Sequence, residues 1–263
     1  MKSILDFQSF KNKNQKITMV TCYDYTFAKI LNTSEIDTLL VGDSVSQVVH
    51  GYPTTLHATV HMMELHTAAV AKGAPNKFVV ADMPFLSTRK GIKHAVEAAG
   101  LLMKAGAQAV KIEGLKGHEK MIQHLIESGI PVMGHLGLTP QSIHQLGGPK
   151  IQGRDEAGAE NILNDALAME KAGCFSLVLE CIPAELAQKI TYALHIPTIG
   201  IGASLHTSGQ VLVLQDMLGL NADFQPKFLK KYSDGAEATI KAINSYVAEV
   251  RAGTFPDKDH SYE

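Results

Sequence analysis

The chain has 263 residues, of which 45% are hydrophobic and 19% are charged. This length and composition suit one large globular domain or two small ones, and they exclude a disulfide-stapled miniprotein and a disordered tail. Lys and Arg together number 24 and Asp and Glu number 26, which gives a formal net charge of −2. Because basic residues are not in excess, the charge does not support binding to nucleic acid or to an anionic membrane.

The three cysteines, Cys22, Cys174 and Cys181, form no CxxC motif. An odd number of cysteines without that motif argues against a disulfide framework or a zinc ribbon and is typical of a reducing compartment. Residues 1–16 lack the long apolar run of a signal peptide. No stretch approaches the ~20 apolar residues that a transmembrane helix requires. We therefore expect a cytoplasmic protein that does not enter a membrane.

Four helical runs end at a glycine and are followed almost at once by an apolar run. The glycines are Gly73, Gly106, Gly129 and Gly173. A glycine just past a helix end can adopt the left-handed conformation that caps the helix. Short, near-continuous runs of Val, Ile and Leu are typical of buried parallel strands. The pattern predicts eight strands, at 17–23, 37–42, 77–82, 108–113, 131–136, 176–180, 197–202 and 210–216.

Helices fit between most of these strands, most clearly over 91–105, 183–194 and 234–252. Eight strands alternating with helices in ~250 residues indicate an α/β protein with a single (β/α)8 TIM barrel. A doubly wound open sheet is the second possibility. The chain shows no linker or break in composition, so we predict one domain over 1–263. In this prediction 1–15 form an N-terminal extension and about 253–263 form a C-terminal tail.

Polar residues gather at the carboxyl ends of the predicted strands, which is the face that carries the active site in such barrels. In chain order they are Tyr23, Asp43, Ser44, Asp82, Lys111, Glu113, His135 and Glu180. Lys111 and Glu113 lie two apart on one strand, so their side chains point the same way. Charges at the mouth of a small barrel are costly unless they are paired or liganded. His135 is equally consistent with a packed histidine and with a catalytic one.

Asp43, Asp82 and Glu113 end three consecutive strands. If those strands are neighbours, the three carboxylates converge and raise one another's pKa values unless a cation lies among them. Oxygen ligands without Cys or His favour Mg²⁺ or Mn²⁺ over zinc, and Mg²⁺ keeps positions open for a chelating substrate. The alternative is that each aspartate only caps the helix that follows it. Three acids on the same rim as Lys111 and Glu180 favour the metal site.

Several segments resemble the ketopantoate hydroxymethyltransferase family in their order and spacing. They include TCYDYTFA (21–28), LVGDS (40–44), VADMPF (80–85), VKIEG (110–114), GHLGLTPQS (134–142), LVLECIP (177–183) and IPTIGIGA (196–203). The resemblance implies a (β/α)8 barrel that assembles as a homodecamer, a pentamer of dimers. It also implies transfer of a hydroxymethyl group from 5,10-methylenetetrahydrofolate to 3-methyl-2-oxobutanoate, giving 2-dehydropantoate. The binding partners would then be a small 2-oxo acid and a reduced folate.

The same resemblance assigns roles to individual residues. It places one Mg²⁺ per subunit on Asp43, Asp82 and Glu113, the keto-acid contacts on Asp43, Ser44, Asp82 and Lys111, and the catalytic base on Glu180. A 2-oxo acid offers a carboxylate oxygen and a keto oxygen to Mg²⁺, which would stabilise the enolate that forms when the C3 proton leaves. Tyr23 and His135 lie near this set without an assigned role. The sequence departs from the family's usual pattern at Ser46 and after Ala203.

Two other functions are consistent with the same residues. One is a Mg²⁺-dependent C–C lyase or mutase that acts on another 2-oxo acid. The other is a metal-free barrel used for binding or assembly. Two connections are unusually long, 43–58 and 137–154, and long loops on a rigid scaffold more often carry function than not.

Overall fold

The structure is a computed structural model that describes residues 3–262. It contains two compact units: a barrel unit that ends at Leu212 and a C-terminal unit that begins at Val213. A single domain over 1–263 stays a prediction. Residues 1–2 of the predicted extension and residue 263 of the predicted tail lie outside the described residues.

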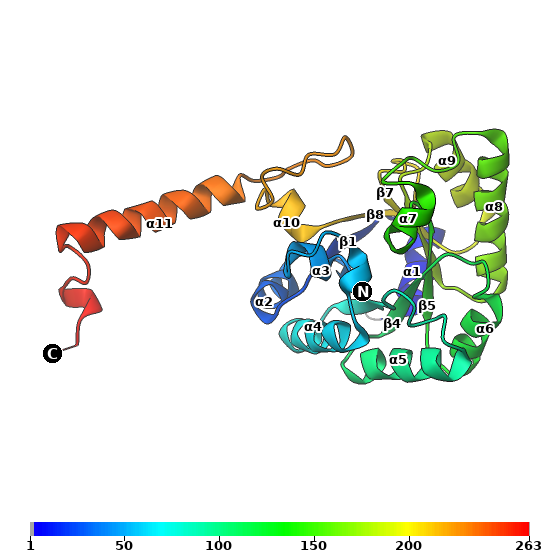
Figure 1. Ribbon diagram of the computed structural model, residues 1–263, viewed down its shortest axis with the longest axis horizontal. Coiled ribbons are helices and arrows are strands. Elements are labelled where there is room, and N and C mark those ends of the chain that lie inside the picture. Colours follow the sequence, from blue (N-terminus) through cyan, green and yellow to red (C-terminus); the bar gives the residue numbers. More distant parts are fainter. Residues whose placement is uncertain (1–2, 263) are drawn as a thin grey trace. The chain divides into compact units, whose positions relative to one another are not determined.

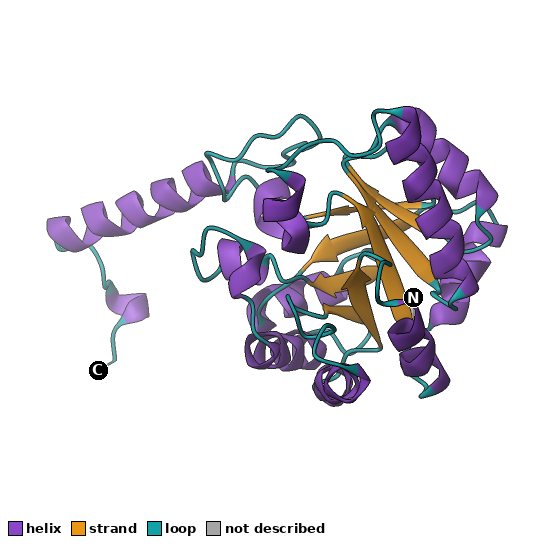
Figure 2. Ribbon diagram, turned by 45° about the vertical axis from the view of Figure 1, so that its right-hand side comes forward, coloured by secondary structure: helices purple, strands orange, loops and turns teal. Residues whose placement is uncertain are grey.

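Eight parallel strands close into a barrel in the order in which they occur in the chain (Figure 2). They are β1 (Ile17–Thr21), β2 (Thr38–Val41), β3 (Phe78–Asp82), β4 (Ala109–Glu113), β5 (Val132–Gly137), β6 (Ser176–Glu180), β7 (Thr198–Ile201) and β8 (Gly209–Leu212). Each strand pairs with the next, and β8 pairs with β1 to close the ring. This confirms the predicted (β/α)8 TIM barrel and excludes the open sheet.

Helices follow the strands and surround the barrel (Figure 1). In this unit they are α2 (Tyr25–Thr33), α3 (Val45–Val48), α4 (Val60–Gly73), α5 (Ile92–Lys104), α6 (Glu119–Glu127), α7 (Ile143–Leu146), α8 (Glu156–Lys171) and α9 (Ala184–Ala193), with the 3-10 turns η1 (Thr55–His57) and η2 (Pro140–Ser142). Several begin at a side-chain cap: Asp24 accepts from Phe27 N at 2.8 Å, and Asp155 accepts from Gly158 N at 2.8 Å. These caps satisfy amide groups that the helix itself leaves unpaired.

The glycines at the helix ends have two different structural roles. Gly106, Gly129 and Gly173 have φ values of 111°, 84° and 100°, as a left-handed cap requires. Gly73 is not left-handed, because it is the last residue of α4. A Cβ placed on Gly73 would lie 2.6 Å from Cβ of Ala28, so this glycine allows α4 to pack closely on α2. The expectation of a left-handed cap at Gly73 was therefore wrong.

A short helix in the predicted N-terminal extension closes the amino end of the barrel. In α1 (Ile4–Asn12), Phe7 is fully buried. Its ring makes edge-to-face contacts with Phe78 at 5.3 Å and with Phe175 at 5.0 Å between centroids. Phe78 begins β3 and Phe175 immediately precedes β6. The inward-facing apolar side chains of the strands continue from there toward the carboxyl end and fill the barrel.

The eighth strand is shorter than predicted. A strand over 210–216 was expected, but β8 ends at Leu212 and Leu214–Met217 form helix α10. The neighbouring strands explain the difference: β7 offers partners only to Gly209 and Gln210, and the pairing with β1 ends at Leu212. Beyond that point, helical hydrogen bonds satisfy backbone groups that no strand can reach.

The C-terminal unit contains α10, the long helix α11 (Gly235–Ala252) and the turn η3 (Lys258–His260). Asp234 precedes α11, and its side chain makes no capping hydrogen bond. Within 3–262, no helix combines the length and the apolar character needed to span a membrane.

Candidate active site

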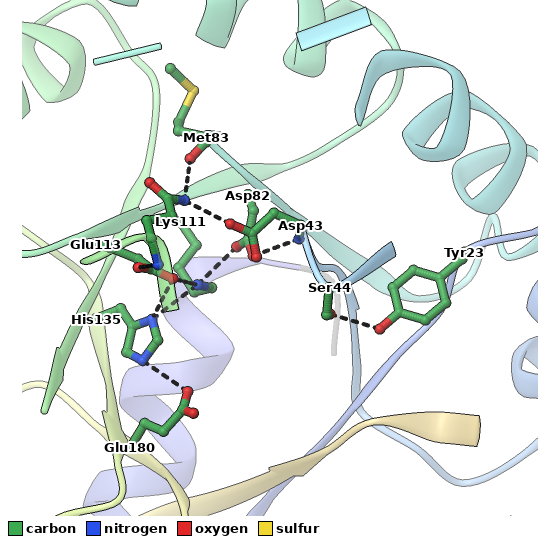
Figure 3. A network of polar contacts seen from close by, with 10 residues as sticks. Tyr23, Asp43, Ser44, Asp82, Met83, Lys111, Glu113, His135 and Glu180 are labelled. Carbon is green, nitrogen blue, oxygen red and sulfur yellow. Dashed lines mark hydrogen bonds and ion pairs between the residues drawn. The ribbon is translucent and has the colours of Figure 1, made fainter. Parts of the chain in front are cut away.

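The polar cluster lies at the carboxyl ends of β2 to β6, on side chains that point toward one another (Figure 3). Asp82 ends β3, Lys111 and Glu113 lie on β4, and His135 lies on β5, while Asp43 follows β2. All five residues are buried, with exposed fractions of 8% or less. Parallel neighbours in register bring these ends together, so the structure confirms that the predicted residues share one rim.

Lys111 lies at the centre of this cluster. Its Nζ is 3.1 Å from Oδ1 of Asp82 and 3.8 Å from Oε1 of Glu113. Burial lowers the pKa of Lys111, but the negative charges of Asp82, Glu113 and Asp43 outweigh burial and raise the pKa above its ordinary value. Lys111 therefore stays protonated, and the cluster contains a fixed positive charge.

The carboxylates of Asp43 and Asp82 lie side by side. The backbone N–H of Asp43 donates to Oδ2 of Asp82 at 3.0 Å. Burial and the charges of Asp82 and Glu113 raise the pKa of Asp43 well above its usual range. Burial also raises the pKa of Asp82, against the opposing effect of Lys111. The mutual repulsion expected of converging acids is thus present for these two aspartates.

Glu113 behaves differently from the two aspartates. Burial raises its pKa, but His135 and Lys111 outweigh burial and hold it below its usual range. Oε1 of Glu113 lies 3.3 Å from Nδ1 of His135. Glu113 is therefore ionised and already paired with two basic side chains.

The donor set fits a divalent cation held directly by two carboxylates. In the part of the chain that the structure describes, no three Asp, Glu, His or Cys side chains are placed to hold one metal ion together. Oδ1 of Asp82 and Oε1 of Glu113 are buried, and their polar neighbours are the basic groups of Lys111 and His135. Mg²⁺ is commonly bound by one or two carboxylates, with water and substrate oxygens completing its octahedron. Asp43 and Asp82 supply two such carboxylates, whereas Glu113 is paired with His135 at 3.3 Å.

His135 connects the acid cluster to Glu180. Its Nε2 lies 3.2 Å from Oε2 of Glu180, and its Nδ1 faces Glu113. Burial and the nearby Lys111 lower the pKa of His135, but Glu113 and Glu180 outweigh both and raise it to about 9. Glu180 ends β6, and its side chain is 17% exposed, so it can reach both His135 and a ligand at the mouth.

Tyr23 and Ser44 form a separate pair beside the acids. The Tyr23 hydroxyl lies 2.8 Å from the Ser44 hydroxyl. Ser44 directly follows Asp43 and is the residue immediately before α3. Ser46, where the sequence departs from the family's usual pattern, donates its hydroxyl to the carbonyls of Asp43 at 2.9 Å and of Thr54 at 3.1 Å. This serine therefore fixes the start of the long connection after β2.

Gln141 was missed by the sequence reasoning. It lies in η2, within the long connection after β5, yet its side-chain amide donates to Oδ2 of Asp43 at 2.8 Å. The motif GHLGLTPQS and the length of that connection marked the segment. Nothing in them indicated which side chain would cross to the acids.

Comparison with known proteins gives matches along the chain. The family model described as Ketopantoate hydroxymethyltransferase matches residues 1–258. A 3-methyl-2-oxobutanoate hydroxymethyltransferase of Bdellovibrio bacteriovorus is 56% identical over 262 residues, covering 100% of both chains. A protein of the same name from Francisella tularensis subsp. novicida is 53% identical over 263 residues, covering 100% of this chain and 99% of the relative.

More distant solved structures share the fold. A phosphonopyruvate hydrolase, in a complex with oxalate and Mg²⁺, superposes with a TM-score of 0.65 at 10% identity, covering 100% of this chain and 92% of that one. A 2,3-dimethylmalate lyase of the PEP mutase/isocitrate lyase superfamily gives 0.61 at 16% identity, covering 96% and 99%. At such low identity these structures support the barrel alone.

Proposed function

Because this chain belongs to the ketopantoate hydroxymethyltransferase family and is a hydroxymethyltransferase of pantothenate biosynthesis, we propose that 5,10-methylenetetrahydrofolate is its one-carbon donor. The acceptor is 3-methyl-2-oxobutanoate and the product is 2-dehydropantoate. Family membership also decides against the two alternatives, a lyase or mutase and a non-catalytic barrel. The observation that carries the proposal is the cluster at one rim of four buried residues, Asp43, Asp82, Lys111 and His135, with the partly exposed Glu180.

The proposed cofactor is one Mg²⁺ per subunit, held directly by Asp43 and Asp82. Glu113 would contribute its negative charge to the same site. Burial and the neighbouring carboxylates raise the pKa of Asp43, and burial raises the pKa of Asp82, so a bound cation would favour the ionised form of both aspartates. When bound, such a cation polarises a keto oxygen and stabilises the negative charge that develops on it.

Glu180 is the proposed base. Its carboxylate would accept the proton from C3 of the keto acid, and the electron pair left on C3 would form the new bond to the folate's one-carbon unit. Both bonds from that unit to the folate nitrogens would break, water would supply the hydroxyl oxygen, and the two nitrogens would take up the proton from C3 and one from water, so that tetrahydrofolate leaves. His135 lies 3.2 Å from Glu180 and orients its carboxylate from the buried side. In this ion pair His135 carries the positive charge and Glu180 the negative charge. In Figure 3, His135 lies between Glu180 and Glu113 and contacts both.

Lys111 and Ser44 are the proposed contacts of the keto acid, together with Asp43 and Asp82. Lys111 is a permanent cation in a buried site, so it suits the substrate carboxylate. The Ser44 hydroxyl is oriented by Tyr23 at 2.8 Å, which leaves it a defined direction for a further hydrogen bond. Tyr23 thus acts on the ligand through Ser44.

We also propose that the enzyme is cytoplasmic and assembles as a homodecamer, a pentamer of dimers. Both proposals rest on the family. The described helices offer no membrane span, and the C-terminal unit exposes apolar side chains that an assembly could cover.

The test is a product assay with purified full-length protein. With Mg²⁺, 3-methyl-2-oxobutanoate and 5,10-methylenetetrahydrofolate, mass spectrometry should detect 2-dehydropantoate, and EDTA should abolish its formation. Oxaloacetate or pyruvate offered without folate should yield no cleavage product. Cleavage of either acid, or product formation that persists without folate, would refute the proposed donor and reaction.

A further inference from the structure

Gln141 follows one strand of the barrel, but it contacts residues at or just beyond the ends of three other strands. It lies in η2, four residues beyond β5, but its partners belong to β2, β3 and β4 or to the residues that follow them. Its amide Nε2 donates to Oδ2 of Asp43 at 2.8 Å and to the carbonyl of Met83 at 3.0 Å. Its backbone N–H donates to Oε2 of Glu113 at 2.9 Å.

The chemistry of these partners fixes the orientation of the amide. A carboxylate oxygen and a backbone carbonyl both accept hydrogen bonds, so the NH₂ group must face them and both of its hydrogens are used. The Met83 carbonyl is part of the backbone just after β3, so it anchors the amide at a defined point. The second hydrogen is thereby aimed at Asp43, as the dashed lines between Met83 and Asp43 trace in Figure 3.

Two acids from different strands are held by this one residue. The side chain of Gln141 orients Asp43, and its backbone orients Glu113 independently of the side chain. The ion pairs of Lys111 run to Asp82 and Glu113. The amide of Gln141 therefore gives Asp43 a directed N–H donor, as Lys111 does for Asp82 and Glu113, but the amide adds no charge.

We propose that Gln141 is a positioning residue of the metal and keto-acid site. It holds the Asp43 carboxylate so that one oxygen is engaged by the amide and the other is directed to the cation. This inference rests on the metal site of the proposed function. Hydrogen-bond partners of metal-ligating carboxylates typically contribute tenfold to a hundredfold to metal affinity, because they fix the ligand before the metal arrives.

The experiment is calorimetric titration of Mg²⁺ into the full-length protein without substrate. Gln141→Met keeps the length and volume of the side chain and the backbone N–H, and removes only the two amide hydrogen bonds. We expect the dissociation constant for Mg²⁺ to rise by about tenfold or more. The metal-free thermal midpoint should stay close to that of the wild type, which a merely structural role would not allow.

Gln152→Met is the matched control. Gln152 lies in the same connection after β5, and its amide donates to the Lys150 carbonyl at 2.9 Å. This variant should bind Mg²⁺ as the wild type does. If Gln141→Met does not fold, the same titration on Gln141→Ala decides the question.

The outcomes separate the two claims. An affinity that is unchanged or tighter when Gln141 is replaced would overturn the positioning role, as would an equal loss in the Gln152→Met control. Absence of Mg²⁺ binding by the wild type would instead refute the proposed metal site, and this inference with it. Weaker binding only when Gln141 is replaced supports both.

Discussion

Lys111 balances the charge of the buried acids, with its Nζ 3.1 Å from Asp82. Lys111→Met should lower the free energy of unfolding at pH 7 by about 3–5 kcal/mol, because it leaves buried carboxylates uncompensated. The loss should shrink as the pH falls, since Asp43 and Asp82 have raised pKa values and become neutral before ordinary aspartates do. Urea denaturation without metal at pH 7 and pH 5 measures both effects.

A surface lysine provides the control for that substitution. Lys93 pairs with Glu97 at 4.0 Å in a largely exposed setting, so Lys93→Met should cost no more than about 1 kcal/mol. A Lys111→Met loss that is equally small, or that does not depend on pH, would contradict the charge balance described here.

Glu180 is the residue whose removal should affect chemistry most and folding least. Glu180→Gln keeps the shape of the side chain but removes the base, so turnover should fall by about 10²–10⁴-fold. Glu185→Gln changes an exposed glutamate in the first turn of α9 and should leave turnover unchanged. Turnover and the thermal midpoint would be measured for both variants. Full activity in Glu180→Gln would remove it from the mechanism.

His135 should give the folded protein a pH-dependent stability. Its pKa is raised to about 9 in the folded state from an ordinary 6.5, so its contribution is complete below about pH 6.5 and is lost as the pH rises to about 9. That interval corresponds to about 3 kcal/mol. The difference in unfolding free energy between wild type and His135→Gln, measured in EDTA, should therefore shrink by that order between pH 6.5 and 9. A difference that stays constant with pH would contradict the raised pKa.

The individual residues of the cluster could be found from the sequence because strand ends can be found. Asp43, Asp82 and Glu113 each follow or end an apolar run, and parallel strands in sequence order bring their carboxyl ends together. Gln141 could not be found in this way. Its contact with Asp43 spans 98 residues and depends on the path of an irregular connection, which periodicity does not encode.

At the scale of elements, α1 closes the barrel through one aromatic side chain. Phe7→Ala should lower the free energy of unfolding by about 3–5 kcal/mol, because it opens a cavity beside Phe78 and Phe175. Leu5 lies on the same helix and is 75% exposed, so Leu5→Ala is the control and should change little. Urea denaturation of both variants measures this. Equal stabilities would mean that α1 is dispensable for the barrel.

The elements that the sequence predicts well are those bounded by local signals. Apolar runs and helix-ending glycines located the eight strands and the order of the barrel. The errors lie where tertiary contacts decide: β8 ends early because its neighbours end, and Gly73 packs against Ala28 in place of capping a helix. The sequence also did not predict that α1 closes the barrel, because a short helix with one buried aromatic residue gives only a weak hydrophobic periodicity.

At the scale of the whole molecule, α11 carries apolar side chains that a single chain leaves exposed. Ile240, Ile243, Tyr246 and Val250 recur at helical spacing and are 45–58% exposed. Under the proposed homodecamer, light scattering coupled to gel filtration should give ten times the mass of one chain, and Ile243→Asp should lower that mass. Lys241→Ser, a polar substitution on the same helix, should not. A monomer mass for the wild type would contradict the assembly.

We propose that Asp43 and Asp82 hold a divalent cation whose coordination a 2-oxo acid completes. The most direct measurement is the anomalous difference map of a crystal grown with Mn²⁺, as a substitute for Mg²⁺, and 3-methyl-2-oxobutanoate. We expect one peak per subunit bonded to oxygens of both aspartates, with the two oxygens of the keto acid on the same ion. A peak elsewhere, or a keto acid bound at a distance from these carboxylates, would contradict it.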